Sequence, residues 1–116
     1  METLRVGIVG TGSIGMVHLD TYAKIPGYKV TAVCDVRETA LAAARAKSGA
    51  AGFVDYHDLV AQKDVDVVAV CTPNYLHAPV TIAALNAGKH VFVEKPMAYD
   101  VKAAKEMIAA RDKSGK

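Results

Sequence analysis

The stretch that decides the fold begins with Leu4-Arg5-Val6-Gly7-Ile8-Val9, continues through Gly10-Thr11-Gly12-Ser13-Ile14-Gly15, and reaches Asp35 after a helical segment and a second apolar run. A GxGxxG pattern alone is a weak signal, because glycines cluster in many turns. Here it follows a strand-like run, opens a helix and precedes an acidic residue by about 20 residues, which is the arrangement of a dinucleotide-binding unit. The competing interpretation is a glycine-rich turn that binds no ligand.

Each glycine of this loop has a separate expected role. Gly10 permits the tight turn, Gly12 lets the backbone approach a pyrophosphate, and Gly15 lets the helix pack closely on the strand. The helix that begins at Ser13 offers unpaired N–H groups and a partial positive charge to phosphate oxygens. We therefore expect this loop to hold the pyrophosphate of a dinucleotide.

Five short apolar runs alternate with helical patterns along the chain. The runs are rich in β-branched residues and bounded by turn residues, which predicts strands at residues 4–9, 29–34, 52–54, 65–71 and 90–94. Helices are expected at residues 13–25, 37–47, 56–62, 76–87 and from 101 onward. Several of the strands are apolar almost throughout, as in parallel sheets that are covered on both faces.

The first and last helices carry predicted buried faces. The first helix is expected to bury Met16, Leu19 and Ala23. For the last helix Asp100 is the expected N-cap, and the predicted stripe is Val101, Ala104, Ile108 and Arg111, with Met107 beside it. Gly88 is the expected left-handed cap after the fourth helix.

The alternation of strands and helices predicts the α/β class, as a Rossmann doubly wound parallel sheet with helices on both faces. Five strands are visible, and the expected order is 3-2-1-4-5 with the sixth strand absent. We interpret residues 1–116 as one dinucleotide-binding domain, with a C-terminal domain also absent. Residues 90–94 would then form an open apolar edge, so we expect self-association or marginal stability.

Composition narrows the classes of protein that the chain can represent. A net charge of +2 and 52% hydrophobic residues argue against disorder and give no support to a nucleic-acid partner. No apolar run approaches the roughly 18 residues of a membrane span, and the N-terminus is a poor signal peptide. We therefore expect a soluble, cytoplasmic protein with no membrane partner. Cys34 and Cys71 end the second and fourth strands, and the first strand lies between these two in the expected sheet. The two cysteines are then too far apart for a disulfide, so we expect both to be free thiols that pack in the core.

Asp35 is the expected acceptor for the hydroxyls of the adenosine ribose. Its carboxylate would repel a 2′-phosphate, which favours NAD over NADP. Arg37 leaves this choice open, because a nearby arginine can accommodate that phosphate. The alternative for Arg37 is a solvated residue early in a helix.

A second group of polar residues is Cys71-Thr72-Pro73-Asn74, followed by His77, at the carboxyl end of the fourth strand. Ligands of open α/β sheets bind beyond the carboxyl ends of the strands, where the strand order switches between strands one and four. We expect these residues to face the cofactor across the crevice. The alternative makes Asn74 a helix cap and His77 a surface histidine.

The third group is Glu94-Lys95-Pro96, which ends the fifth strand on the same edge of the sheet. Beside the cationic ring of NAD⁺, the ammonium form of Lys95 would be disfavoured, which suits proton transfer. Glu94 could hold a cofactor hydroxyl or orient Lys95. An ordinary charged exit from a strand is the alternative.

We expect no metal site at Asp55, His57 and Asp58, because no further ligand lies near them in sequence.

The sequences VGIVGTGSIG, CTPNYLH and HVFVEKP, together with Asp35, resemble the glucose–fructose oxidoreductase, inositol dehydrogenase and rhizopine-catabolism family (Gfo/Idh/MocA). The resemblance covers nearly the whole chain. It implies a cofactor site made by Gly10, Gly12, Ser13, Ile14, Gly15, Asp35, Thr72, Asn74, His77, Glu94 and Lys95. From their positions beside these residues, we expect Thr11, Arg37, Cys71, Pro73 and Pro96 to belong to the same site. It implies that Lys95 is the catalytic lysine, and that the Lys95–Pro96 bond is cis.

The resemblance implies an NAD(P)-dependent oxidoreductase. The reaction would move a hydride between the nicotinamide and a secondary alcohol or carbonyl of a sugar or cyclitol. The substrate pocket and a catalytic histidine would come from the absent domain, so the chain alone would be catalytically incomplete. The alternative is a stand-alone or engineered module that binds NAD without turnover.

Overall fold

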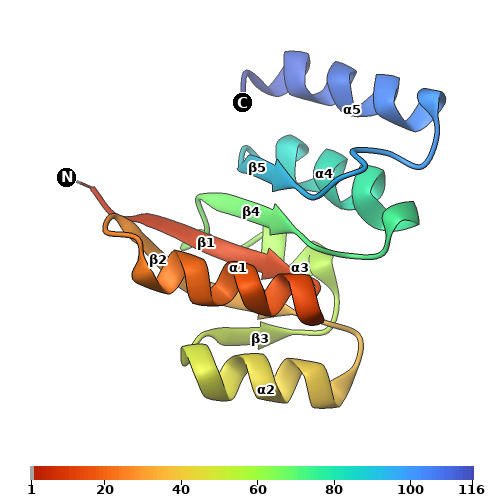
Figure 1. Cartoon of the computed structure of the whole chain (residues 1–116). Helices are drawn as coiled ribbons and strands as arrows, with labels where there is room; N and C mark the ends of the chain where they lie inside the picture. The colour runs from red at the N-terminus through yellow and green to blue at the C-terminus, as the bar shows by residue number, and fades with distance from the viewer. Residues whose placement is uncertain (1) are drawn as a thin grey trace.

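The computed structural model of the chain describes residues 2–116 (Figure 1). Its strands are β1 (Leu4–Val9), β2 (Tyr28–Cys34), β3 (Ala51–Phe53), β4 (Val67–Val70) and β5 (His90–Val93). Its helices are α1 (Ser13–Lys24), α2 (Glu38–Ser48), α3 (Tyr56–Val60), α4 (His77–Asn86) and α5 (Val101–Ser114). A 3₁₀ turn, Asn74–Leu76, leads into α4. The predicted order of elements is confirmed.

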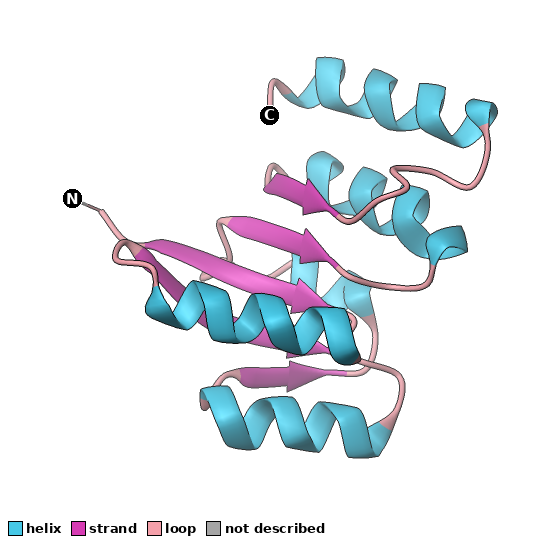
Figure 2. Cartoon of the chain, viewed as in Figure 1, coloured by secondary structure: helices cyan, strands magenta, loops and turns pink. Residues whose placement is uncertain are grey.

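All five strands are parallel, in the order β3-β2-β1-β4-β5 (Figure 2). The order reverses at β1, which pairs with β2 on one side and with β4 on the other. The chain leaves β1 and β4 in opposite directions, and this opens a crevice at their carboxyl ends. The predicted doubly wound sheet is confirmed.

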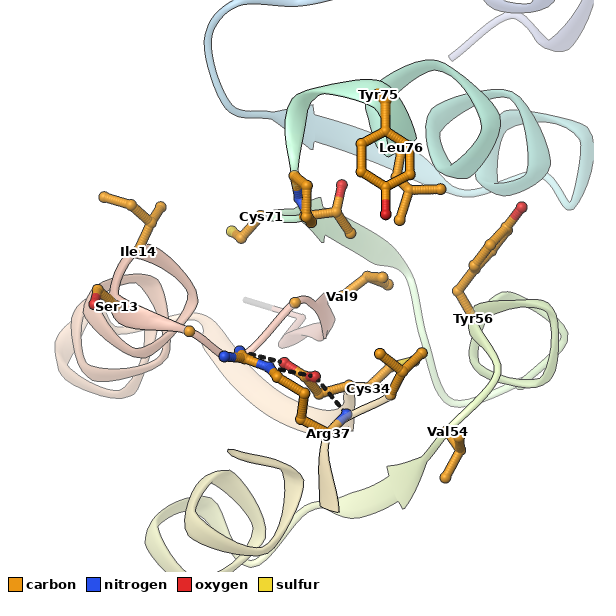
Figure 3. A pocket seen from close by; sticks show the side chains of 16 residues that line it. Val9, Ser13, Ile14, Cys34, Arg37, Val54, Tyr56, Cys71, Tyr75 and Leu76 are labelled. Carbon is orange, nitrogen blue, oxygen red and sulfur yellow. Dashed lines mark hydrogen bonds and ion pairs between the residues drawn. The ribbon is translucent and has the colours of Figure 1, made fainter. Parts of the chain in front are cut away.

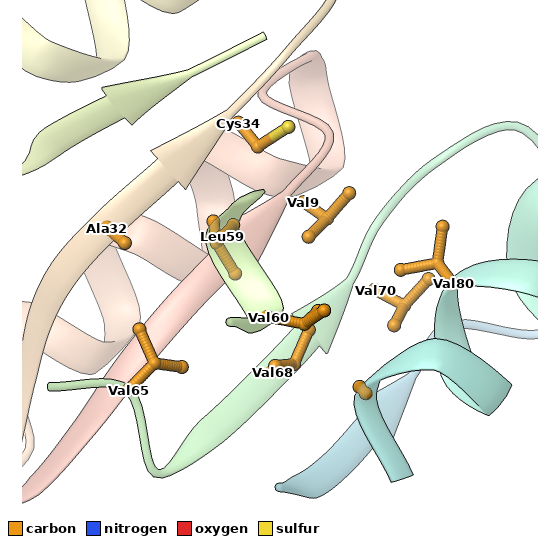
Figure 4. Close-up of a cluster of buried hydrophobic side chains, with 10 residues drawn as sticks. Val9, Ala32, Cys34, Leu59, Val60, Val65, Val68, Val70 and Val80 are labelled. Atoms are coloured by element: carbon orange, nitrogen blue, oxygen red, sulfur yellow. The ribbon is translucent and has the colours of Figure 1, made fainter. Parts of the chain in front are cut away.

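Two separate apolar clusters show that helices cover both faces of the sheet. One cluster includes Leu19 of α1 and Ala44 of α2, packed against Val6 and Ile8. The other includes Leu59 of α3 and Val80 of α4, packed on the opposite face (Figure 4). Because β1 and β4 are buried on both sides, almost every position in them is apolar.

The buried faces of two helices differ from the prediction. In α1 Leu19 is buried as expected, but Ala23 is exposed and Tyr22 packs against the core in its place. In α5 Met107 and Ala110 are the buried residues, whereas Val101 and Ile108 are 70% and 42% exposed. The reason for the second difference is that α5 packs against α4 and not on the sheet, so it buries only a narrow strip.

The two predicted helix caps, at Asp100 and Gly88, agree with the structure, although several helix ends differ from the prediction by one or two residues. The Asp100 side chain accepts a hydrogen bond from the Ala103 N–H and caps α5. Gly88 has a φ of 80°, the left-handed conformation expected after α4.

Strand β5 pairs with β4, and Phe92 in its middle is 48% exposed. Within residues 2–116, none of the helices has the length and apolar character needed to cross a membrane.

Candidate functional site

A cavity of about 530 Å³ lies at the carboxyl edge of the sheet (Figure 3). One wall is the loop between β1 and α1, and the opposite wall is the segment that follows β4. Its lining includes Gly10, Gly12, Ser13, Ile14, Asp35, Arg37, Cys71, Thr72 and Pro73, all expected from the sequence. Residues from three strand ends therefore meet at one site, as the rule for open α/β sheets predicts.

The glycine loop has the geometry that its pattern predicts. Gly10 has a φ of 93°, a left-handed conformation that other residues rarely adopt. At Gly15 a Cβ atom would lie 1.8 Å from the carbonyl oxygen of Gly10, so no side chain fits there. A Cβ at Gly12 would meet only the Arg37 guanidinium, at 3.2 Å. A flexible side chain therefore faces Gly12, whereas fixed backbone lies against Gly15.

The Asp35 carboxylate at the end of β2 is buried and accepts hydrogen bonds from two residues. Thr11 donates from its N–H at 2.9 Å and from its hydroxyl at 3.1 Å. Arg37 donates from its N–H, Nε and Nη2 at 2.8, 3.2 and 3.0 Å. Burial alone would raise the pKa of Asp35, but the bonds from Arg37 and Thr11 outweigh burial and hold the pKa at about 2. Asp35 is therefore a fixed anion beside the cavity.

Thr72 and His77 lie on the wall that follows β4. The hydroxyl oxygen of Thr72 is buried and has no hydrogen-bond partner among the described residues, which is costly unless a ligand or water supplies one. The His77 ring is 1% exposed, with Nδ1 2.6 Å from the Pro96 carbonyl and Nε2 2.9 Å from the Thr72 carbonyl. The ring donates to both oxygens at once only when both nitrogens carry protons. His77 thus ties the segment after β4 to the segment after β5.

A smaller cavity of about 210 Å³ shares Ile14, Cys71 and Thr72 with the larger one. Its other lining residues are Asn74, His77, Glu94 and Lys95. The structure therefore brings the second and third predicted groups together around one space. Lys95 is exposed at its rim, and the Lys95–Pro96 bond is cis as predicted.

Three predicted site residues contribute from behind the lining. Thr11 is buried, and its N–H and hydroxyl are both used to hold Asp35. Gly15 lies against the Gly10 carbonyl, and Pro96 supplies the carbonyl that faces His77. These residues support the site without lining either cavity.

The sequence did not predict the apolar walls of the larger cavity. Val36, Val54, Tyr56 and Tyr75 line it, and Val36 and Tyr75 are 80% and 64% exposed. Large exposed apolar side chains around a cavity mouth suit the binding of a flat ring. Their positions in the sequence could have identified three of these residues. Val36, Val54 and Tyr75 each closely follow the carboxyl end of a strand.

Sequence reasoning also missed His18, in the middle of α1. Its Nε2 lies 2.8 Å from Oε1 of Glu94. The hydrogen bond from His18 lowers the pKa of the Glu94 carboxyl, and partial burial opposes this effect. No sequence pattern pointed to this pair.

The two cysteines are free thiols, and Asp55 pairs with His57. Burial raises the pKa of the Cys34 and Cys71 thiols to about 12, and both cysteines are free, as predicted. Asp55 caps α3 by accepting from the His57 N–H and pairs with the His57 ring. In the part of the chain that the structure describes, no group of three or more His, Cys, Asp or Glu side chains could hold a metal ion.

The lining fits a dinucleotide. The Gly12 backbone, which only the flexible Arg37 side chain faces, and the first turn of α1 suit a pyrophosphate, and Asp35 suits a ribose diol. Thr72, whose buried hydroxyl has no partner among the described residues, lines the cavity from the opposite wall. Together the fold and the site define a dinucleotide-binding domain of the Rossmann type.

The chain belongs to the Gfo/Idh/MocA family. A family model described as an oxidoreductase family with an NAD-binding Rossmann fold matches residues 4–116. The predicted resemblance is therefore confirmed, and the domain is the NAD-binding domain of this oxidoreductase family.

Relatives and solved structures agree with this assignment. Inositol 2-dehydrogenase of Salmonella typhimurium is 45% identical over 98% of this chain and 35% of its own length. WlbA dehydrogenase from Chromobacterium violaceum, solved with NADH and UDP-GlcNAcA, matches with a TM-score of 0.95 and 37% identity, over 100% of this chain and 34% of its own. Biliverdin reductase from Synechocystis, solved with biliverdin and NADP⁺, has a TM-score of 0.92 and 28% identity, over 97% of this chain and 36% of its own. The chain spans about a third of the length of these proteins.

Proposed function

We propose that this domain binds NAD(H) across the carboxyl edge of its sheet and serves a dehydrogenase that acts on a secondary alcohol or carbonyl of a sugar or cyclitol. The observation that carries the proposal is the meeting of the glycine loop, Asp35 and the unpartnered Thr72 hydroxyl around one cavity. The substrate class is supported by the inositol dehydrogenase relatives and by the UDP-GlcNAcA in the WlbA structure.

The two cavities would hold different halves of the cofactor. The first-turn N–H groups of α1 would bind the pyrophosphate, and Asp35 the adenosine ribose. Glu94 and Lys95 in the smaller cavity would face the nicotinamide half. When bound, the nicotinamide supplies a hydride acceptor or donor, and Lys95 would hold or move the proton at the substrate oxygen. Further substrate groups would come from a second segment of polypeptide.

NAD is the favoured cofactor over NADP. The Asp35 carboxylate is fixed in its ionised form, and a 2′-phosphate beside it would be repelled. Arg37 is the group that could offset this repulsion, but its guanidinium already binds Asp35. We expect NAD⁺ to bind more tightly than NADP⁺, and Asp35→Asn to reduce that preference.

Calorimetric titration with NAD⁺ and NADP⁺ tests the binding proposal. Asp35→Asn should weaken NAD⁺ binding about tenfold or more, because it removes a charged acceptor. Asp66→Asn is the matched control: the pKa of Asp66 is also held at about 2, by Arg5, but the residue lies at the opposite edge of the sheet. Equal losses in the two variants, or no binding by the native chain, would contradict the proposal.

Lys95→Met tests the proposed proton transfer, because methionine keeps the length of the side chain but loses the amine. The whole protein that contains this domain should lose turnover of a polyol substrate while NAD⁺ affinity stays near its native value. If turnover survives in Lys95→Met, Lys95 does not transfer the proton. Binding without turnover in the native protein would favour the alternative of a module that only binds NAD, which the family and its dehydrogenase relatives do not favour.

We also propose that two copies of the chain associate through β5 and that the protein works in the cytoplasm. The first part is supported by Phe92, which is 48% exposed on a strand that pairs only with β4 among the described elements. Sedimentation should show a dimer that Phe92→Lys weakens, and a monomer at high concentration would contradict the proposed association.

The free thiols support the proposal that the protein works in the cytoplasm, which cell fractionation would test.

A further inference from the structure

A histidine of α1 and a carboxylate that follows β5 form a pair at the smaller cavity. Nε2 of His18 lies 2.8 Å from Oε1 of Glu94, across 76 residues of sequence. The His18 and Glu94 side chains are 18% and 27% exposed, so water only partly screens the contact. The pair joins the helix that opens with the glycine loop to the segment that carries Lys95.

Aromatic neighbours hold the His18 ring in place. Its centroid lies 5.3 Å from that of Phe92 and 6.3 Å from that of Tyr22. Phe92 belongs to β5, two residues before Glu94, so the same strand supports both the ring and its hydrogen-bond partner. Packing therefore directs Nε2 at the carboxylate without help from any ligand.

The second oxygen of Glu94 points to the next residue. Oε2 accepts a hydrogen bond from the Lys95 N–H at 3.3 Å, and both residues line the smaller cavity. Among the described residues, the titratable groups around the pair are Lys95, Tyr22 of α1 and Cys71 at the end of β4. Glu94 thus has its two oxygens held from two different elements.

We propose that His18 is a positioning residue that holds Glu94, and through it the Lys95 segment, toward the nicotinamide half of the cofactor. This rests on the proposed binding of NAD by the domain. A carboxylate fixed before binding loses little side-chain entropy when it accepts a hydrogen bond from a ribose hydroxyl. Without His18, Glu94 can turn toward solvent, and the nicotinamide half loses a preorganised acceptor. The pyrophosphate and adenosine half depend on other residues.

The test compares a ligand with the nicotinamide half and one without it. Calorimetry on the full chain would measure NAD⁺ and ADP-ribose binding to the native protein, His18→Phe and His18→Gln. Phenylalanine keeps the ring against Phe92 but cannot donate, whereas glutamine places an N–H near the native Nε2. We expect His18→Phe to weaken NAD⁺ about tenfold, the value of one hydrogen bond to a charged group, and to leave ADP-ribose unchanged. His18→Gln should restore most of the NAD⁺ affinity.

A surface histidine provides the control. His57→Phe also breaks a histidine–carboxylate pair, with Asp55, but at the start of α3, and it should change neither affinity. His18→Asn, too short to reach Glu94, repeats the loss should His18→Phe not fold. Native NAD⁺ affinity in His18→Phe, or equal losses for NAD⁺ and ADP-ribose, would overturn the positioning role alone. A native chain that binds neither ligand would overturn the proposed function as well.

Discussion

Asp35→Asn is the substitution whose effect on stability is most directly set by the structure. The Asp35 carboxylate accepts five hydrogen bonds, two from Thr11 and three from Arg37. An asparagine keeps one oxygen but turns the other position into an NH₂ group, which would face N–H and O–H donors. The variant therefore loses the charge and also leaves buried donors without partners.

The size of the loss follows from the pKa of the Asp35 carboxyl. Its value of about 2 in the folded chain lies below its ordinary value of 3.8, so the folded state favours the ionised form. The corresponding stabilisation is about 2 kcal/mol at pH 7. Because the folded pKa is lowered, the stabilisation is complete well above 3.8 and is lost as the pH falls through about 2. At pH 3 about half of it remains.

Urea unfolding of the native chain and of Asp35→Asn at pH 7 and pH 3 measures this difference. We expect the variant to be less stable by about 2 kcal/mol at pH 7, and the gap to shrink by about 1 kcal/mol at pH 3. A gap below about 0.5 kcal/mol at pH 7, or one that is equal at the two pH values, would refute the reasoning. In either case the Arg37 and Thr11 bonds would not stabilise the ionised carboxyl.

Three further substitutions and one chemical treatment have expected outcomes. Gly15→Ala should destabilise the chain by about 3 kcal/mol or more in urea unfolding, because its Cβ would lie 1.8 Å from the Gly10 carbonyl oxygen. Gly12→Ala, which meets only the flexible Arg37 guanidinium, should fold normally and lose NAD⁺ affinity in calorimetry. His77→Phe should lower the free energy of unfolding by about 1–3 kcal/mol, because the partly buried Thr72 and Pro96 carbonyls would then face a ring that cannot donate a hydrogen bond. Both cysteine thiols, with pKa values of about 12, should resist alkylation at pH 8 until urea unfolds the chain, and rapid labelling of the native chain would show that they are accessible.

The strand order could be predicted because the strands are apolar on both faces and regularly separated by helices. What failed was the choice of buried face in α1 and α5. Helical spacing gives a face but not the element that it meets, and α5 meets α4 and not the sheet. The Val101 and Ile108 side chains therefore stay exposed although they share an apolar stripe.

The site could be predicted where the rule of carboxyl strand ends applies. It brought the glycine loop, Asp35, Thr72 and Glu94 to one edge, where the structure has them. The exposed apolar side chains around the cavity follow the same strand ends, but they carry no polar group that would mark them as site residues. Val36 and Tyr75 were missed for that reason, since their exposure becomes informative only once the cavity is known.

Two carboxylates at the crevice show where prediction from sequence stops. Asp35 is held by Arg37, two residues away, and a partner that close is visible in the sequence. Glu94 is held by His18, and that pair depends on how α1 lies across the sheet relative to β5. Both carboxylates are nevertheless fixed by side chains of the domain itself. A ligand that meets them needs to order fewer groups, so removing either partner should cost affinity even where the ligand never touches that partner.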